Sequence, residues 1–239
     1  MFVVHKLLLT LLFYFFTGST IFSQNLELND NIEEFILKNP EIIIKSLQNY
    51  EKNKEQEKEN NIKKFLKENI NTLQNGDGEL FSGQKESKNI IIEFFDYNCG
   101  YCKKSHDEIK KILFEEEEVK IVYLNLPVLS DNSVELSKIS LAIGLKDKIK
   151  FNKFHDFLLS TKKSPKNNNI KSFIEELGLD YDKIKKSSES EQIKEIIKKN
   201  ILMANNLKIG GTPAFIINGE LISGFVSKKI MISLLKKDN

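Results

Sequence analysis

The sequence predicts an α/β fold with a helical insertion, preceded by a separate N-terminal helical stalk. A continuous apolar run at residues 90–95 is rich in β-branched and aromatic side chains, which is typical of a buried strand. A second strand-like run at residues 120–126 follows the helix-length segment 99–114. This order predicts a parallel strand–helix–strand unit. The chain returns to strands only near its C-terminal end, after a long helical stretch.

The later elements follow from local signals. The helical pattern of residues 133–160 breaks near Gly144, and Ser188 with Glu191 forms a capping box for the longest later helix. Asn218-Gly219 is a hairpin turn signal. The expected elements are two helices within 133–160, helices at 170–177, 181–186 and 188–207, strands at 214–217 and 221–222, and a closing helix at 227–236.

The amino-acid composition excludes several classes of protein. Apolar residues make up 40% and charged residues 29% of the 239 residues, which excludes a mostly disordered or collagen-like chain. The net charge is only +2, and every basic residue is a lysine. A nucleic-acid binder usually shows a strong basic excess and arginine forks, so we expect no nucleic-acid partner. Two cysteines are too few for a disulfide framework or a four-cysteine zinc site.

The first 23 residues have the pattern of a secretory signal peptide. His5 and Lys6 precede an apolar run at residues 7–16, and small residues follow at 18–20 and at Ser23. The apolar run is shorter than the roughly 20 residues of a membrane span. The alternative is an uncleaved N-terminal anchor. We expect an exported protein in an oxidising compartment.

Residues 24–75 form the predicted stalk, and residues 79–239 form the main domain. Asn39-Pro40 separates a short helix from a long one, because proline favours the first helical position. The segment 51–61 contains no apolar residue, so it should be a solvated helix. The alternative is a flexible charged linker. Because apolar stripes flank this segment, we expect a homo-oligomer formed through residues 30–73. The stripe residues are Ile32, Phe35, Ile36, Ile43, Leu47 and Tyr50 before the polar segment, and Ile62, Phe65, Leu66, Ile70 and Leu73 after it.

The two cysteines form a Cys-x-x-Cys pair where the first strand gives way to a helix. Unpaired backbone N–H groups and the macrodipole at a helix start favour an anion, so a thiolate there has a lowered pKa. We therefore expect Cys99 to attack a disulfide and Cys102, one turn further, to resolve the mixed disulfide. Two alternatives are a plain structural disulfide and a metal site that adds His106. Otherwise His106 is expected to be a surface helix residue.

Two separate motifs carry a family resemblance. Residues 92–103, Ile-Glu-Phe-Phe-Asp-Tyr-Asn-Cys-Gly-Tyr-Cys-Lys, resemble the active-site segment of DsbA-like thioredoxin-fold thiol–disulfide oxidoreductases. Residues 210–215, Gly-Gly-Thr-Pro-Ala-Phe, resemble their cis-proline loop. The resemblance covers about residues 79–239. It implies a thioredoxin fold, a periplasmic location, exported client proteins with cysteines, a membrane redox partner and no cofactor or metal.

The resemblance also implies roles for individual residues. Thr212 and Pro213, joined by a cis bond, would lie against the Cys99 sulfur and hold the client chain, with Gly100 and Tyr101 beside them. Glu93 would exchange a proton with Cys102. The alternatives are an ordinary trans proline at a strand start and a Glu93 side chain that strand alternation turns to solvent.

The direction of the reaction stays open between oxidase and isomerase. Gly100-Tyr101 between the cysteines, and a threonine before the proline, resemble the DsbC-type isomerases. Residues 32–42 resemble the oligomerising stalk of ScsC-type proteins. Two other classes remain as alternatives: a thioredoxin-fold chaperone or metal carrier without redox turnover, and a structural exported protein with one disulfide.

Overall fold

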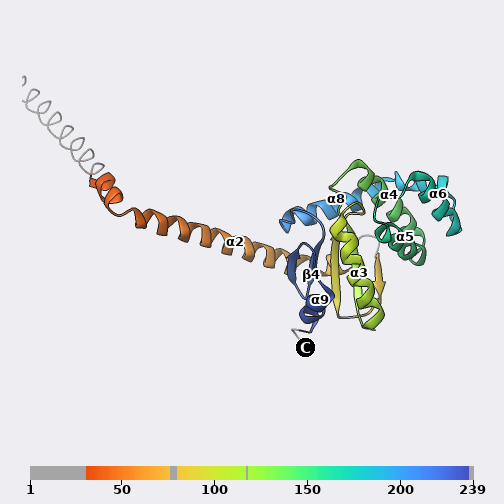
Figure 1. Cartoon of the computed structure of the whole chain (residues 1–239), viewed down its shortest axis with the longest axis horizontal. Helices are drawn as coiled ribbons and strands as arrows, with labels where there is room; N and C mark the ends of the chain where they lie inside the picture. Colours follow the sequence, from red (N-terminus) through yellow and green to blue (C-terminus); the bar gives the residue numbers. More distant parts are fainter. Residues whose placement is uncertain (1–30, 76–79, 117, 237–239) are drawn as a thin grey trace, which may run out of the picture. The chain divides into compact units, whose positions relative to one another are not determined.

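A computed structural model describes residues 31–75, 80–116 and 118–236 of the chain. Helices cover a central sheet in the part of the chain that follows the long helix α2 (Figure 1), which confirms the predicted α/β class. The expected signal peptide at residues 1–23 lies outside the described residues. None of the described helices is long and apolar enough to cross a membrane.

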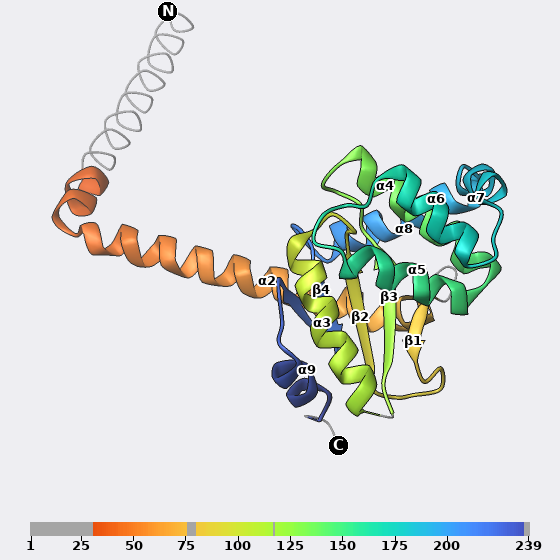
Figure 2. The ribbon, with the colours of Figure 1, turned by 45° about the vertical axis from the view of Figure 1, so that its right-hand side comes forward.

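The sheet has five strands in the order β1-β3-β2-β4-β5 (Figure 2). Strands β2 and β3 are parallel, as predicted, and the other three pairs are antiparallel. The helix α3 (Gly100–Glu115) connects the parallel pair. The strands are β1 (Phe81–Gly83), β2 (Ile90–Phe95), β3 (Lys120–Asn125), β4 (Ala214–Ile217) and β5 (Glu220–Ser223).

Strand alternation divides the core between the two faces of the sheet. Ile91 and Phe95 belong to the larger cluster, which includes residues of α3. Ile92 and Phe94 belong to a smaller cluster on the other face. Because both faces are covered, β2 is apolar along nearly its whole length, which explains the continuous run in the sequence.

The helices after β3 match the predicted insertion, with one difference at the first break. They are α4 (Asp131–Lys146), α5 (Lys148–Ser160), α6 (Asn167–Glu176), α7 (Tyr181–Ser188), α8 (Glu191–Asn206) and, after the hairpin, α9 (Lys228–Leu235). The first break falls at Asp147, whose carboxylate accepts the backbone N–H groups of Ile149 and Lys150. Gly144 lies inside α4, where an added Cβ would come 2.3 Å from a methyl group of Leu80. This glycine therefore permits close packing and does not end the helix.

The predicted capping box at α8 is wrong, whereas the predicted hairpin turn is confirmed. Ser188 is the buried last residue of α7, and its hydroxyl donates to the carbonyl of Lys185. Ser190 occupies the N-cap of α8. Asn218 and Gly219 both have positive φ, 48° and 74°, as a two-residue hairpin turn between β4 and β5 requires.

The N-terminal helical pattern is confirmed where it is described. Residues 31–38 are helical, and α2 runs from Pro40 to Asn75. Asn39 separates the two helices, and its side-chain amide donates to the carbonyl of Phe35. Residues 51–61 are exposed along the helix, as their composition predicts.

The two apolar stripes of α2 have different surroundings. The chain divides into two compact units after Glu59. In the second unit, Leu66 and Leu73 are buried in the smaller core cluster together with Phe94 and Val122. Burying each leucine contributes about 2 kcal/mol. The stripe at 62–73 therefore packs within the chain, and the exposed large apolar side chains of α2 lie before residue 51.

Candidate active site

Cys99 is the N-cap of α3, directly after the turn that follows β2. Its sulfur accepts the backbone N–H of Cys102 at 3.4 Å, and its own N–H donates to the carbonyl of Asp96 at 3.0 Å. Both cysteines are free thiols. Cys99 is 7% exposed and Cys102 is fully buried. The pair therefore presents one sulfur to the surface and keeps the other beneath it.

The loop before β4 faces the Cys99 sulfur. The Thr212–Pro213 bond is cis, as the resemblance implies. The Cys99 sulfur lies 3.1 Å from the carbonyl oxygen of Thr212, to which it can donate only while it is protonated. The register of β2 against β4 pairs Phe94 with Ala214, so the two motifs meet at one edge of the sheet.

The two sulfurs have opposite proton affinities. The pKa of Cys99 is lowered to about 5, chiefly by a hydrogen bond with the Cys102 side chain, although partial burial opposes this shift. Thr212 and the backbone of Cys102 and Tyr101 lower the same pKa further. Burial raises the pKa of Cys102 above its usual range. At neutral pH the outer sulfur is a thiolate and the inner one is a thiol.

Glu93 is fully buried, so the alternative in which it faces solvent is wrong. It shares a sheet face with Phe95, beneath α3. Burial raises the pKa of its carboxyl well above the usual range, and the charge of Cys99 raises it further. Neither carboxyl oxygen has a hydrogen-bond partner among the described residues. The group is therefore a neutral acid at rest.

Gly100 and Tyr101 lie at the surface beside Cys99. Tyr101 is 64% exposed, and a Cβ added at Gly100 would meet no atom within 4 Å. Both positions are open to a client chain, which is compatible with the role that the resemblance implies.

The sequence analysis missed the residues that hold this turn in place. One carboxylate oxygen of the buried Asp96 accepts the N–H of Asn98, and the other accepts the N–H groups of Val128 and Leu129. The Asn98 amide donates to Ser133 and to two neighbouring side chains. Asp and Asn in a short turn often bond nearby backbone groups, and this signal was available in the sequence.

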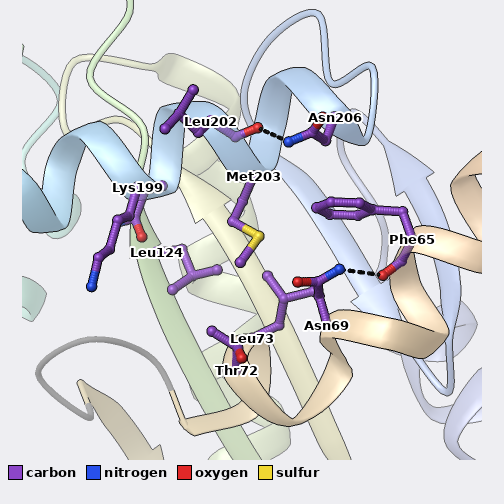
Figure 3. Close-up of a pocket in the computed structure, with 10 residues that line it drawn as sticks. Phe65, Asn69, Thr72, Leu73, Leu124, Lys199, Leu202, Met203 and Asn206 are labelled. Atoms are coloured by element: carbon purple, nitrogen blue, oxygen red, sulfur yellow. Dashed lines mark hydrogen bonds between the residues drawn. The ribbon is translucent and has the colours of Figure 1, made fainter.

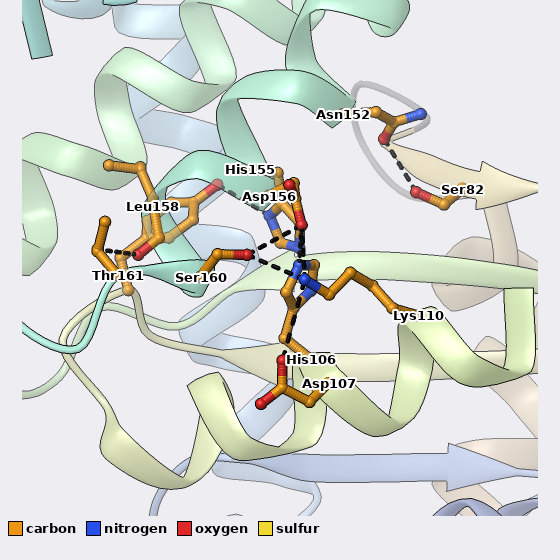
Figure 4. Close-up of polar contacts among 11 residues, drawn as sticks. Ser82, His106, Asp107, Lys110, Asn152, His155, Asp156, Leu158, Ser160 and Thr161 are labelled. Carbon is orange, nitrogen blue, oxygen red and sulfur yellow. Dashed lines mark hydrogen bonds and ion pairs between the residues drawn. The ribbon is translucent and has the colours of Figure 1, made fainter.

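The prediction that His106 is a surface residue is wrong. His106 is 3% exposed, and its Nε2 lies 2.9 Å from Oδ1 of Asp156 on α5 (Figure 4). The neighbouring His155 is also buried, and its Nδ1 lies 3.1 Å from the hydroxyl of Tyr97. The described residues contain no cluster of three or more metal-ligating His, Cys, Asp or Glu side chains.

An apolar cavity of about 350 Å³ lies between α2, α8 and β3 (Figure 3). Phe65, Leu73, Leu124 and Met203 are among its lining residues. Leu124 belongs to the sheet face opposite to Glu93, and none of the expected site residues lines this cavity.

A dithiol at a helix start, opposite a cis-proline loop on this sheet, defines the thioredoxin-fold class of thiol proteins. The DSBA-like thioredoxin domain family matches residues 90–235. Because this match covers more than half of the chain, the chain belongs to that family.

Individual relatives resemble this chain at low identity. A probable disulfide bond formation protein D from Bacillus cereus is 25% identical over 170 residues, which cover 64% of this chain and 79% of that protein. A Na⁺/H⁺ antiporter NhaA of Salinispora tropica is 22% identical over 144 residues, or 60% of this chain. The match spans only 22% of the antiporter's own length.

Solved structures show the same fold. The thiol–disulfide exchange protein α-DsbA2 from Wolbachia pipientis is 25% identical, with a TM-score of 0.67 over 75% of this chain and 97% of that one. A linker-deletion variant of ScsC from Proteus mirabilis is 22% identical, with a TM-score of 0.67 over 90% of this chain and 94% of that one. At this identity, the second likeness concerns the fold alone.

The first prediction concerns the titration of Cys99. In the reduced protein, alkylation of Cys99 by iodoacetamide should reach half its maximal rate near pH 5. Cys102→Ala should move this midpoint upward, because it removes the largest cause of the lowered pKa. A wild-type midpoint near the ordinary thiol value of about 8.5, or faster alkylation of Cys102, would contradict the assignment.

The second prediction concerns the stability cost of Glu93. The folded protein keeps a proton on Glu93 that the unfolded chain loses above about pH 4.5. The free energy of unfolding should therefore fall as the pH rises above 4.5, by up to about 1.4 kcal/mol per pH unit. Glu93→Gln should remove this slope and stabilise the protein at pH 7.

Urea unfolding between pH 4.5 and 8 measures this effect. A Cys99→Ser background keeps the thiolate from titrating in the same range, and Glu176→Gln, at an exposed position, is the matched control. Parallel stability curves for Glu93→Gln and its parent would show that Glu93 is not held protonated.

Proposed function

We propose that this chain is an exported protein-disulfide oxidoreductase that forms or rearranges disulfides in client proteins. The observation that carries the proposal is the division of protonation between the two cysteines. Cys99 is a stabilised thiolate at the surface, and Cys102 is a buried thiol one helical turn away. Nucleophilic attack and resolution need these two states.

The proposed chemistry follows from the geometry. In the reducing direction, the Cys99 thiolate attacks one sulfur of a client disulfide, a mixed disulfide with Cys99 forms, and the other client sulfur leaves as a thiolate. Cys102 then loses its proton, attacks the Cys99 sulfur and releases the client as a thiolate. In the oxidising direction, a client thiolate attacks the Cys99–Cys102 disulfide and Cys102 leaves with a proton from Glu93. A second client thiolate then displaces Cys99 and completes the client disulfide, so two electrons pass to the enzyme in oxidation and to the client in reduction. In isomerisation a client thiolate displaces Cys99 before Cys102 reacts, and no electrons pass between client and enzyme.

The client chain would lie along the Thr212–Pro213 loop. The carbonyl of Thr212 is within hydrogen-bond distance of the Cys99 sulfur, so a client sulfur bonded to Cys99 would lie beside this loop. Tyr101 offers an exposed aromatic ring next to the same sulfur. These contacts support the binding roles proposed for Gly100, Tyr101, Thr212 and Pro213.

Location and partners complete the proposal. Residues 1–23 would direct export to the periplasm, where oxidising conditions allow disulfides to persist. The clients would be exported proteins with cysteines. A membrane redox partner would restore the working oxidation state after each turnover.

The N-terminal segment would join copies of the chain. Ile32, Phe35, Leu37, Ile44 and Leu47 are exposed large apolar side chains before residue 51. Exposed apolar groups at this density are typical of an interface. Several active sites tethered together raise the effective concentration of thiols around one client, which favours isomerisation.

The third prediction tests the two cysteines. Cys99→Ser should abolish dithiol oxidation and the rescue of a scrambled disulfide-bonded protein, because the nucleophile is lost. Cys102→Ser should accumulate mixed disulfides with clients on non-reducing gels, because nothing resolves them. Absence of turnover in the wild-type protein would instead favour the chaperone or carrier class.

The fourth prediction tests the N-terminal segment. The chain from residue 24 should self-associate at tens of micromolar in sedimentation experiments. Deleting residues 24–59, a cut that keeps Leu66 and Leu73 in the core, should give a monomer that still oxidises dithiols and isomerises poorly.

A pair of point variants checks the same surface. Ile43→Glu with Leu47→Glu should dissociate the oligomer, because charges replace exposed apolar contacts. Lys52→Glu, in the polar segment of the same helix, should leave it intact. If the chain from residue 24 is already a monomer at tens of micromolar, this part of the proposal fails.

A further inference from the structure

A buried cluster of aromatic and imidazole rings lies beneath the dithiol, between β2, β3, α3 and α5. The rings of Tyr123 and His155 are 4.2 Å apart between centroids, and those of His155 and His106 are 5.4 Å apart. His106 lies one turn after Cys102 on the buried face of α3. The cluster reaches the surface at Asp156, whose side chain is about half exposed (Figure 4).

The proposed exchange chemistry moves a proton in a place without direct access to solvent. Cys102 and Glu93 are both fully buried. The route by which a proton could reach solvent past Cys99 is narrow, because this residue is itself only 7% exposed. In the mixed disulfide the client is bonded to Cys99 and covers that opening, at the stage when Cys102 must lose its proton.

Glu93 lies next to the inner end of the ring cluster. Glu93 and Tyr123 are register partners in the parallel pair β2–β3, so their side chains lie on the same face, one strand spacing of about 5 Å apart. Glu93 is near enough to both Tyr123 and Cys102 that its ionised form raises the pKa of each. A continuous series of neighbours thus leads from Cys102 to Asp156.

Several buried polar atoms between Cys102 and Asp156 have no hydrogen-bond partner among the described residues. Both oxygens of Glu93, Nε2 of His155 and Nδ1 of His106 are buried without a hydrogen-bond partner among the described residues. Buried polar atoms are normally satisfied, and ordered water satisfies those that lack a protein partner. Four such atoms on three neighbouring titratable groups fit a hydrogen-bonded chain that includes water.

We propose that His155 and His106 form a proton path between Glu93 and Asp156, which stays open while a client covers Cys99. The proposal rests on the proposed exchange function and adds the route by which its proton reaches solvent. His155 and His106 do not touch the reacting sulfurs, so they act through Glu93 as positioning and relay residues.

Resolution of the mixed disulfide moves one proton out of the protein. Cys102 gives its proton to one oxygen of the neutral Glu93 carboxyl, and the other oxygen releases its proton through water and the Tyr97 hydroxyl to Nδ1 of His155. His155 then releases the proton on its Nε2 through water to Nδ1 of His106, whose Nε2 faces Asp156. One proton emerges at Asp156, and the Cys102 sulfur forms the bond to Cys99 while the Cys99–client bond breaks. The enzyme dithiol is oxidised and the client disulfide is reduced. In the opposite direction the proton moves inward.

The protonation states suit a relay. Burial lowers the pKa of both imidazoles, so each is neutral at pH 7 and offers one N–H donor and one acceptor. The hydrogen bond to Asp156 and the charge of Asp156 raise the pKa of His106 and so oppose the effect of burial. The titratable and charged groups around the two rings are Tyr97, Tyr123, Asp107, Lys110 and Asp156, and Glu93 lies beyond Tyr123.

The test compares resolution when a protein client covers Cys99 with resolution when a small oxidant leaves Cys99 open to solvent. Single turnovers of the reduced full chain are followed with two oxidants: a folded, tryptophan-containing protein with one strained, exposed disulfide, which is a stronger oxidant than a structural one, and excess oxidised glutathione. The chain itself has no tryptophan, so the fluorescence reports on the client. His155→Phe keeps an aromatic ring in the cluster, and Asp156→Asn changes only the half-exposed end of the path. Phe151→Leu, beside His155, perturbs packing without removing a titratable group.

We expect His155→Phe to slow the resolving step with the protein client at least tenfold, which is less than the usual effect of direct proton transfer of about 10²–10⁴-fold because His155 acts through Glu93. Asp156→Asn should slow the same step less. The slowed step should show a larger rate ratio between H₂O and D₂O than the wild type. Formation of the mixed disulfide and the reaction with oxidised glutathione should be unchanged, and Phe151→Leu should behave like the wild type.

Three results would overturn the path. These are an unchanged resolving step in both His155→Phe and Asp156→Asn, an equal slowing in Phe151→Leu, and an equal slowing with oxidised glutathione. Failure of the wild-type chain to react with either oxidant would instead contradict the proposed function itself.

Discussion

The stabilisation of one sulfur anion at the start of α3 is the interaction on which the site depends. Strand β2 ends at a turn that brings Cys99 to the N-cap, where backbone N–H groups point at its sulfur. The Cys102 thiol completes the stabilisation from the next turn of the helix. A thiolate that is stable without a bond to a second sulfur disfavours the disulfide, and this makes the pair a good disulfide donor.

The surrounding structure preserves this asymmetry. Asp96 accepts three backbone N–H groups and fixes the turn against the loop after β3. Burial keeps Cys102 and Glu93 protonated beneath the thiolate. Holding a neutral acid in the core costs stability at neutral pH, as burial of a polar group without partners generally does. The cost is concentrated at a residue positioned to exchange a proton with the buried thiol.

Local sequence patterns predicted much of the fold and of the active site. The run at residues 90–95 gave the central strand, Asn218-Gly219 gave the hairpin, and the position of Cys99 gave the helix start. The cis loop at Thr212 came from the family resemblance, since a proline at a strand start is equally compatible with a trans bond. The main cause of the low Cys99 pKa was missed, because a hydrogen bond between two side chains has no local signature.

Contacts between distant segments explain the other differences. His106 lies at the spacing of the buried positions Cys102 and Ile109, yet only α5, about 50 residues later, supplies its partner Asp156. The stripe at 62–73 was interpreted as an interface between copies because its pattern does not identify what covers it. In the structure, Leu66 and Leu73 find their partners on the chain's own sheet.

The reduction potential of the Cys99–Cys102 pair tests the central claim most directly. It is obtained by equilibrating the protein with glutathione buffers and measuring the oxidised fraction. A Cys99 pKa near 5 lies between the about 7 of thioredoxin and the about 3.5 of DsbA. The account therefore predicts a potential between their respective values of about −270 mV and about −120 mV. A potential at or below that of thioredoxin would show that the thiolate is not stabilised relative to the disulfide, and would contradict the account.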